Sequence, residues 1–84
     1  MKENNPNSAG LVVGCPKEIK NQENRVALTP GGARQLVRQG VTVLVEAGAG
    51  AGAAYTDAEY LAAGALIAET AADVFSRADI VVKV

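Results

Sequence analysis

The sequence predicts an α/β fold with a parallel sheet, because apolar runs of strand length alternate with helical patterns from residue 11 to residue 84. The expected strands are residues 11–13, 41–45, 65–68 and 80–84, and the first expected helix covers residues 30–39. The connections are long enough to contain helices, as parallel neighbours require. The order β-α-β-α-β-α-β predicts a sheet with flanking helices and right-handed crossovers, of a Rossmann-like or flavodoxin-like kind and incomplete.

The first expected strand leads into a long charged loop. Gly14 and Pro16 bound the apolar run 11–13, which favours a buried strand. The following helix begins at Thr29 and Pro30, since a threonine oxygen can accept a free backbone N–H and proline lacks the N–H that the first turn leaves unpaired. The charged residues between them are Lys17, Glu18, Lys20, Glu23 and Arg25. Ligands of open α/β sheets bind at the carboxyl ends of strands, so this loop is the candidate functional segment.

The helices have recognisable starts and ends. The first ends before Gly40, a residue suited to the left-handed conformation after a helix. The second begins at a capping box formed by Thr56 and Glu59 and ends at Gly64, and the third begins at Thr70. The side chains expected to face inward from the first and third helices are Ala33, Leu36, Val37, Val74, Phe75 and Ala78.

Composition excludes several classes of protein. A formal net charge of −1, with two Tyr and one Phe, argues against nucleic-acid binding. No apolar run approaches the length of about 20 residues that a membrane span needs, and no secretion signal is recognisable. The single cysteine, Cys15, cannot form an internal disulfide, so a cytoplasmic location is expected. At 84 residues the chain is at most one small domain, and because it ends inside an apolar run we expect it to be part of a longer protein, with residues 1–10 a disordered leader.

One glycine-rich stretch has two interpretations. Residues 48–53 satisfy G-x-G-x-x-A after an apolar strand, and Glu69 follows about twenty residues later, which together approach a dinucleotide fingerprint. That fingerprint directs a helix N-terminus at the pyrophosphate, whereas here the capping box starts the helix at Thr56, after the last glycine. We therefore favour a close-packed turn and assign no cofactor-binding residue to it.

The motifs resemble those of a known family. The runs PKEIKNQENRVALTP, VEAGAGAGAAYTDAEYLAAGA and ADIVVKV resemble the amino-terminal part of alanine dehydrogenase and, next, of the α subunit of proton-translocating nicotinamide nucleotide transhydrogenase. The resemblance covers residues 11–84. It implies that these residues are part of a substrate domain, that NAD binds to a later domain, and that the intact protein is an oligomer, commonly a hexamer.

Arg25 is the main candidate for a substrate-binding residue. From the sequence alone, an arginine in such a loop is commonly solvated or paired with Glu18 or Glu23, although its planar fork of donors also suits a carboxylate. In the family, the arginine of the N-N-E-x-R-V-A motif binds the substrate carboxylate, and Arg25 of NQENRVA matches it. Gln22 departs from the usual Asn, which should not affect the guanidinium.

Lys83 is a weaker candidate. Family members typically read K-V-K-E-P here, and the second lysine contacts substrate, whereas Lys83 aligns with the first and the second would follow Val84. Lys17 and Lys20 could raise the positive potential of the loop but are expected to be solvated. Cys15 is expected to be a small packed residue.

The resemblance implies an NAD-dependent alanine dehydrogenase that interconverts L-alanine with pyruvate and ammonium. Catalysis needs proton-transfer groups, and the family uses a downstream histidine and aspartate, whereas this sequence contains no histidine. We therefore assign no catalytic and no metal-binding residue, and expect these residues alone to be inactive. Two alternatives remain, namely the transhydrogenase α subunit and a non-catalytic module that binds small ligands such as carboxylates or partner proteins.

Overall fold

The computed structural model describes residues 10–19 and 24–84. The elements in chain order are β1 (Val12–Cys15), α1 (Pro30–Arg38), β2 (Thr42–Glu46), the 3₁₀ helix η1 (Ala51–Ala53), α2 (Asp57–Ala62), β3 (Leu66–Ala68), α3 (Ala71–Arg77) and β4 (Ile80–Val81). Apart from Gly10, the expected leader lies outside the described residues, as do Lys20 and Glu23. No helix of the described part has both the length and the apolar character needed to cross a membrane.

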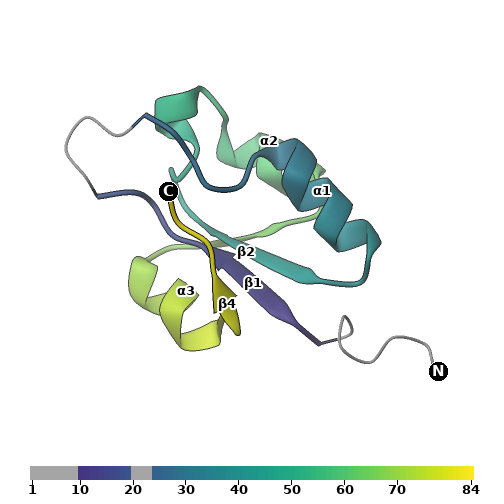
Figure 1. The fold of residues 1–84 in the computed structure, drawn as a ribbon. Helices are drawn as coiled ribbons and strands as arrows, with labels where there is room; N and C mark the ends of the chain where they lie inside the picture. The colour runs from purple at the N-terminus through teal and green to yellow at the C-terminus, as the bar shows by residue number, and fades with distance from the viewer. Residues whose placement is uncertain (1–9, 20–23) are drawn as a thin grey trace.

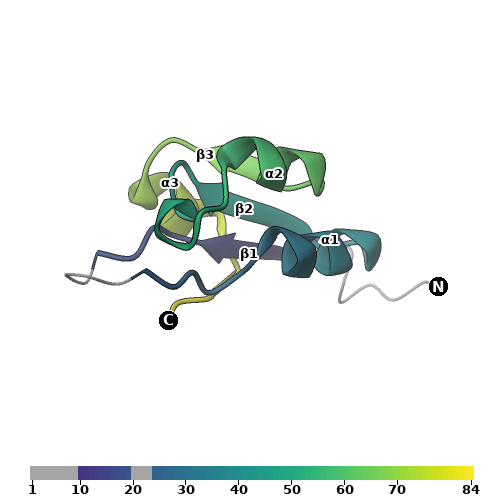
Figure 2. The same cartoon turned by 90° about the horizontal axis from the view of Figure 1, so that it is seen from above.

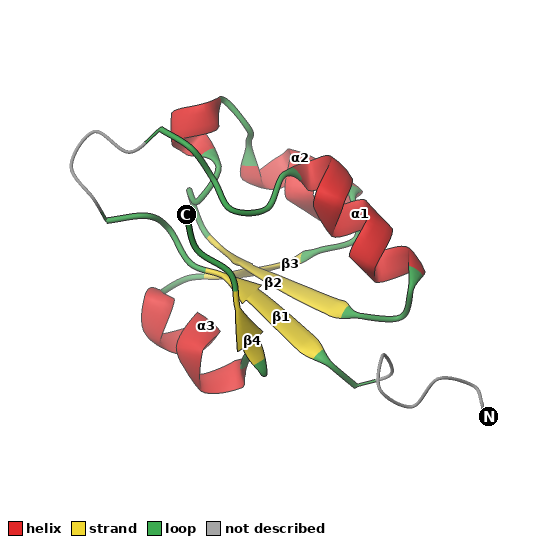
Figure 3. Cartoon of the chain, in the orientation of Figure 1, coloured by secondary structure: helices red, strands yellow, loops and turns green. Residues whose placement is uncertain are grey.

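The four strands form one parallel sheet in the order β3-β2-β1-β4 (Figures 1 and 3). The chain therefore adds strands on one side of β1 and then crosses to the other side for β4. The carboxyl ends of β1 and β4 flank the point where the direction of winding changes. Open α/β sheets bind ligands beside such a point, because the loops diverge there and leave a crevice. The predicted parallel α/β architecture is confirmed.

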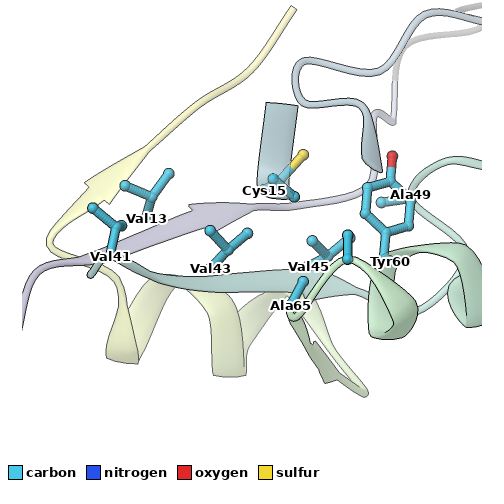
Figure 4. Close-up of a cluster of buried hydrophobic side chains, with 10 residues drawn as sticks. Val13, Cys15, Val41, Val43, Val45, Ala49, Tyr60 and Ala65 are labelled. Carbon is cyan, nitrogen blue, oxygen red and sulfur yellow. The ribbon is translucent and has the colours of Figure 1, made fainter. Parts of the chain in front are cut away.

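The two faces of the sheet are covered by different helices. Helices α1 and α2 lie on one face and α3 on the other (Figures 1 and 2). Because side chains alternate along a strand, Val13 and Cys15 of β1 contribute to the core beneath α1 and α2. Strand β2 is buried on both faces, with Val43 and Val45 on that side and Leu44 on the side of α3. Figure 4 shows the larger of the two clusters.

The predicted helix starts are confirmed by their hydrogen bonds. The Thr29 hydroxyl accepts the backbone N–H of Gly32, with Pro30 in the first turn of α1. In the capping box, the Thr56 hydroxyl accepts the Glu59 N–H while the Glu59 carboxylate accepts the Thr56 N–H. Gly40 and Gly64 have positive φ angles after their helices, as expected. The chain's own capping residues thus fix where α1 and α2 begin and end.

Phe75 corrects one prediction about the third helix. Its side chain is 52% exposed, although we expected it to face inward. Val74 and Ala78 cover Gly14 of β1 instead, and a β-carbon on Gly14 would lie only 2.6 Å from Val74 Cγ1 and 2.7 Å from Ala78 Cβ. Successive helix positions point about 100° apart, so directing Val74 at the sheet turns Phe75 away.

The last strand is shorter than the predicted range 80–84. Strand β4 ends at Val81, although the Val82 N–H still donates to the carbonyl oxygen of Gly14 at 2.9 Å. The next bond of a parallel ladder would require an N–H from Pro16, which has none. The ladder therefore stops, and the chain beyond Val82 is released toward the loop that follows β1.

Candidate functional site

The candidate site lies at the carboxyl ends of β1 and β4. Arg25 is in the connection that follows β1, and Lys83 is in the segment that follows β4, so their two segments leave adjacent strands at the same edge of the sheet. Figure 2 shows the β1 connection and the C-terminus on that side. Arg25 and Lys83 are both exposed. The predicted loop location is thus confirmed, while the role of each residue in binding stays a prediction.

Three contacts fix the segment that carries Arg25. The Asn24 backbone packs against Gly52, where an added β-carbon would lie 3.1 Å from the Asn24 Cα. The Tyr60 hydroxyl donates a 2.7 Å hydrogen bond to the carbonyl oxygen of Leu28. Thr29 then caps α1. Because these contacts lie on both sides of Arg25, they hold its backbone over the carboxyl edge of the sheet.

Cys15 and Tyr60 form the buried floor beneath this segment. Both are 0% exposed, and both lie on the face of the sheet that carries Val43 and Val45 (Figure 4). Desolvation raises the pKa of the Cys15 thiol, and backbone hydrogen bonds from Leu28 and Ala27 oppose part of that rise. Desolvation also raises the pKa of Tyr60 to about 12. At neutral pH Tyr60 therefore remains a hydrogen-bond donor, and Cys15 is the packed residue that the sequence predicts.

Two carboxylates tie the site's segments together. Glu18, in the β1 connection, accepts the backbone N–H of Val84 at 2.9 Å. This hydrogen bond, the Glu18–Val84 bridge, joins the connection that carries Arg25 to the segment that follows β4, one residue after Lys83. Glu46, at the end of β2, accepts the backbone N–H of Lys17 at 2.8 Å. Glu18 and Glu46 thus act as acceptors for backbone N–H groups of the segments that form the site.

The glycine-rich stretch packs as a turn. The Gly48 N–H donates to the Asp57 carboxylate at 2.9 Å, so an acidic side chain of α2 stands where a nucleotide fingerprint would receive a phosphate. A β-carbon on Gly50 would lie 2.7 Å from Cε2 of Tyr60 and 2.8 Å from the Tyr55 Cβ. Close approach of aromatic side chains therefore accounts for Gly50. The sequence did not predict η1, which forms part of this turn.

Two common features of a ligand site are absent from the residues that the structure describes. These residues contain no cluster of three or more His, Cys, Asp or Glu side chains suited to a metal ion. They enclose no pocket by themselves. Sequence reasoning missed Glu18 as a bridge and Tyr60 as a support, because each bond joins residues far apart in the chain. Neither pairing has a local sequence signal.

Comparison with known proteins identifies the family. The family described as alanine dehydrogenase/PNT, N-terminal domain, matches residues 14–84. The alanine dehydrogenase of Methanococcus maripaludis is 54% identical over 74 residues, which are 88% of this chain and 20% of that protein. The alanine dehydrogenase of Mycobacterium tuberculosis is 53% identical over 72 residues, which are 86% of this chain and 19% of that protein.

Two solved structures have the same fold. An L-alanine dehydrogenase aligns with a TM-score of 0.84 and 49% identity, covering 87% of this chain and 20% of that one. A transhydrogenase from Sinorhizobium meliloti aligns with a TM-score of 0.79 and 42% identity, covering 86% and 20%. The chain thus spans about a fifth of the length of these relatives. Since the family match extends over residues 14–84, the chain belongs to the alanine dehydrogenase/PNT N-terminal domain family.

Proposed function

We propose that residues 11–84 form the amino-terminal part of the substrate domain of an NAD-dependent alanine dehydrogenase. The intact enzyme converts L-alanine, NAD and water to pyruvate, ammonium and NADH. NAD binds to a later domain and supplies the hydride acceptor. The enzyme works in the cytoplasm as an oligomer, commonly a hexamer in this family. Relatives named alanine dehydrogenase, at 50 to 58% identity to this chain, support the proposal.

The observation that carries the proposal is the position of the Arg25 segment beside the change in winding direction between β1 and β4. A guanidinium there can donate two parallel hydrogen bonds to a carboxylate, which both binds a small acid and fixes its orientation. Lys83, on the neighbouring segment, is the weaker candidate for a second positive group. In this arrangement Arg25 fixes the carboxylate end of alanine or pyruvate, and the α-carbon is directed away from the sheet edge.

The proposed reaction needs further groups from beyond these residues. Removal of a proton from the substrate nitrogen requires a general base, and the sequence contains no histidine. Two acidic side chains of the site's segments, Glu18 and Glu46, already accept backbone N–H groups. We therefore propose that this part of the enzyme binds and orients the substrate carboxylate, and that proton transfer is performed by later segments.

The substitution Arg25→Lys in the full-length enzyme tests this assignment. Lysine keeps the charge but loses the bidentate fork, so we expect kcat/KM for pyruvate to fall about 10- to 100-fold, the loss typical of a charge-assisted hydrogen bond. The KM for NADH should stay within about twofold. Arg38→Lys is the matched control, because Arg38 is exposed in the last turn of α1, at the opposite edge of the sheet. An unchanged kcat/KM for Arg25→Lys would remove Arg25 from the binding site.

A transhydrogenase α subunit is the second candidate, since the Sinorhizobium meliloti structure shares the fold at 42% identity. Its activity would be hydride transfer between two nicotinamide nucleotides without turnover of alanine. An assay of the full-length protein separates the candidates directly. NADH formation that depends on L-alanine supports the dehydrogenase, whereas reduction of an NAD analogue by NADPH in the absence of alanine supports the transhydrogenase.

A further inference from the structure

Tyr60 reaches from α2 to the segment that carries the proposed carboxylate-binding residue. Its side chain is fully buried, and its hydroxyl donates a 2.7 Å hydrogen bond to the carbonyl oxygen of Leu28. Leu28 is three residues after Arg25 and directly before the cap of α1. The bond joins residues 32 positions apart, so it attaches the Arg25 segment to helix α2.

The surroundings of the Tyr60 hydroxyl leave it little freedom. Gly50 lies so close that a β-carbon there would be 2.9 Å from the Tyr60 hydroxyl oxygen. Tyr55 also packs against the Tyr60 ring in a T-shaped arrangement, with centroids 6.4 Å apart and planes at 76°. The glycine-rich turn and Tyr55 therefore fix the position of the Tyr60 ring, and the Tyr60 hydroxyl in turn fixes the Leu28 carbonyl.

We infer that Tyr60 is a positioning residue for Arg25, setting the height of the Arg25 segment over the carboxyl edge of the sheet through the Tyr60–Leu28 hydrogen bond. This inference rests on the proposed function, in which Arg25 binds the substrate carboxylate. Bidentate recognition requires two donors to meet two oxygens at once, so a small displacement of the backbone weakens it. Tyr60 itself lies below the loop and is not assigned any contact with substrate.

The matched substitutions Tyr60→Phe and Tyr55→Phe separate positioning from packing. Tyr60→Phe keeps the ring and removes only the hydroxyl that supports Leu28. Tyr55→Phe removes a hydroxyl from the same aromatic pair, and that hydroxyl makes no hydrogen bond to any residue that the structure describes. We expect Tyr60→Phe to raise the KM for pyruvate about three- to tenfold, the range that one hydrogen bond supplies, while kcat and the KM for NADH stay within about twofold. Tyr55→Phe should leave all three constants unchanged.

The double variant Arg25→Lys/Tyr60→Phe, in the full-length enzyme, tests whether Tyr60 acts through Arg25. If Tyr60 acts through Arg25, adding Tyr60→Phe to Arg25→Lys should raise the KM for pyruvate by less than about twofold. The reason is that the bidentate contact that Tyr60 positions has already been lost in Arg25→Lys. Equal effects in both backgrounds would overturn the inference, and so would a lowered melting temperature with an unchanged KM. If Arg25→Lys alone leaves pyruvate kinetics intact, the proposed function fails. If Arg25→Lys is impaired and Tyr60→Phe is not, only the positioning role fails.

Discussion

A methyl group added at Gly50 separates the packing interpretation of the glycine-rich turn from a nucleotide site. Gly50 has φ −91° and ψ 0°, which alanine can adopt, so the effect of Gly50→Ala is steric rather than conformational. The new β-carbon would meet atoms of Tyr60 and Tyr55 at 2.7 to 2.9 Å. Because Tyr60 is fully buried, its ring has no open space to enter.

The expected change in the free energy of unfolding of Gly50→Ala follows from these contacts. Overpacking of a buried site costs about 1–3 kcal/mol, and burial of one added methyl offsets about 0.8 kcal/mol at most. We expect Gly50→Ala to lower the free energy of unfolding by about 2 kcal/mol. Gly31→Ala is the matched control, because its β-carbon would find only the Thr29 Oγ1 at 3.9 Å on the exposed first turn of α1. This control should stabilise the protein by about 0.5–1 kcal/mol through reduced freedom of the unfolded chain.

Urea unfolding and ligand titration of the full-length enzyme provide the assay. A loss of about 2 kcal/mol lowers the urea midpoint by about 1 M when the m-value is about 2 kcal/mol/M. Gly50→Ala should also raise the KM for pyruvate, since displacement of Tyr60 releases Leu28, and should leave the dissociation constant of NADH unchanged. A dinucleotide fingerprint requires the opposite result, in which Gly50→Ala is as stable as Gly31→Ala and loses affinity for NADH; that result would contradict a packed turn.

Two further predictions concern the Glu18–Val84 bridge and the ionisation of Tyr60. Glu18→Ala removes the acceptor for the Val84 N–H and should raise the KM for pyruvate about three- to tenfold. Glu18→Gln keeps an oxygen acceptor, so its KM should stay within about twofold of the wild-type value. Equal kinetics for the two variants would exclude a role for the bridge. Burial raises the pKa of Tyr60 to about 12, so the native state keeps a proton that the unfolded chain loses from about pH 10. The stabilisation of the native state by the protonated Tyr60 hydroxyl is therefore present below pH 10 and is lost as the pH rises toward 12. Over that range the urea midpoint of the wild type should fall with pH, and that of Tyr60→Phe should fall less steeply. Identical slopes for the two proteins would contradict the raised pKa of Tyr60.

Local signals predicted most of the fold because they depend on neighbours in sequence. Thr29 and the Thr56–Glu59 capping box each satisfy N–H groups within three residues, and the structure confirms both. The continuous apolar run 41–45 predicted a strand, and the structure has β2 there with Val43, Leu44 and Val45 buried. The position of the Arg25 loop at the carboxyl edge followed from the strand order along the chain.

Features that depend on tertiary contacts were not predictable in the same way. The end of β4 depends on a missing N–H at Pro16, which directly follows the neighbouring strand β1. The exposure of Phe75 depends on Gly14, which lets Val74 approach the sheet. The Glu18–Val84 bridge and the Tyr60–Leu28 bond join residues 66 and 32 positions apart. A single sequence carries no local pattern for such pairs.

The most direct test of the account is a crystal structure of the full-length enzyme with pyruvate bound. We expect two guanidinium nitrogens of Arg25 to lie about 2.7–2.9 Å from the two carboxylate oxygens, beside the carboxyl ends of β1 and β4. A pyruvate carboxylate bound by other residues, with the Arg25 side chain directed into solvent, would contradict the account.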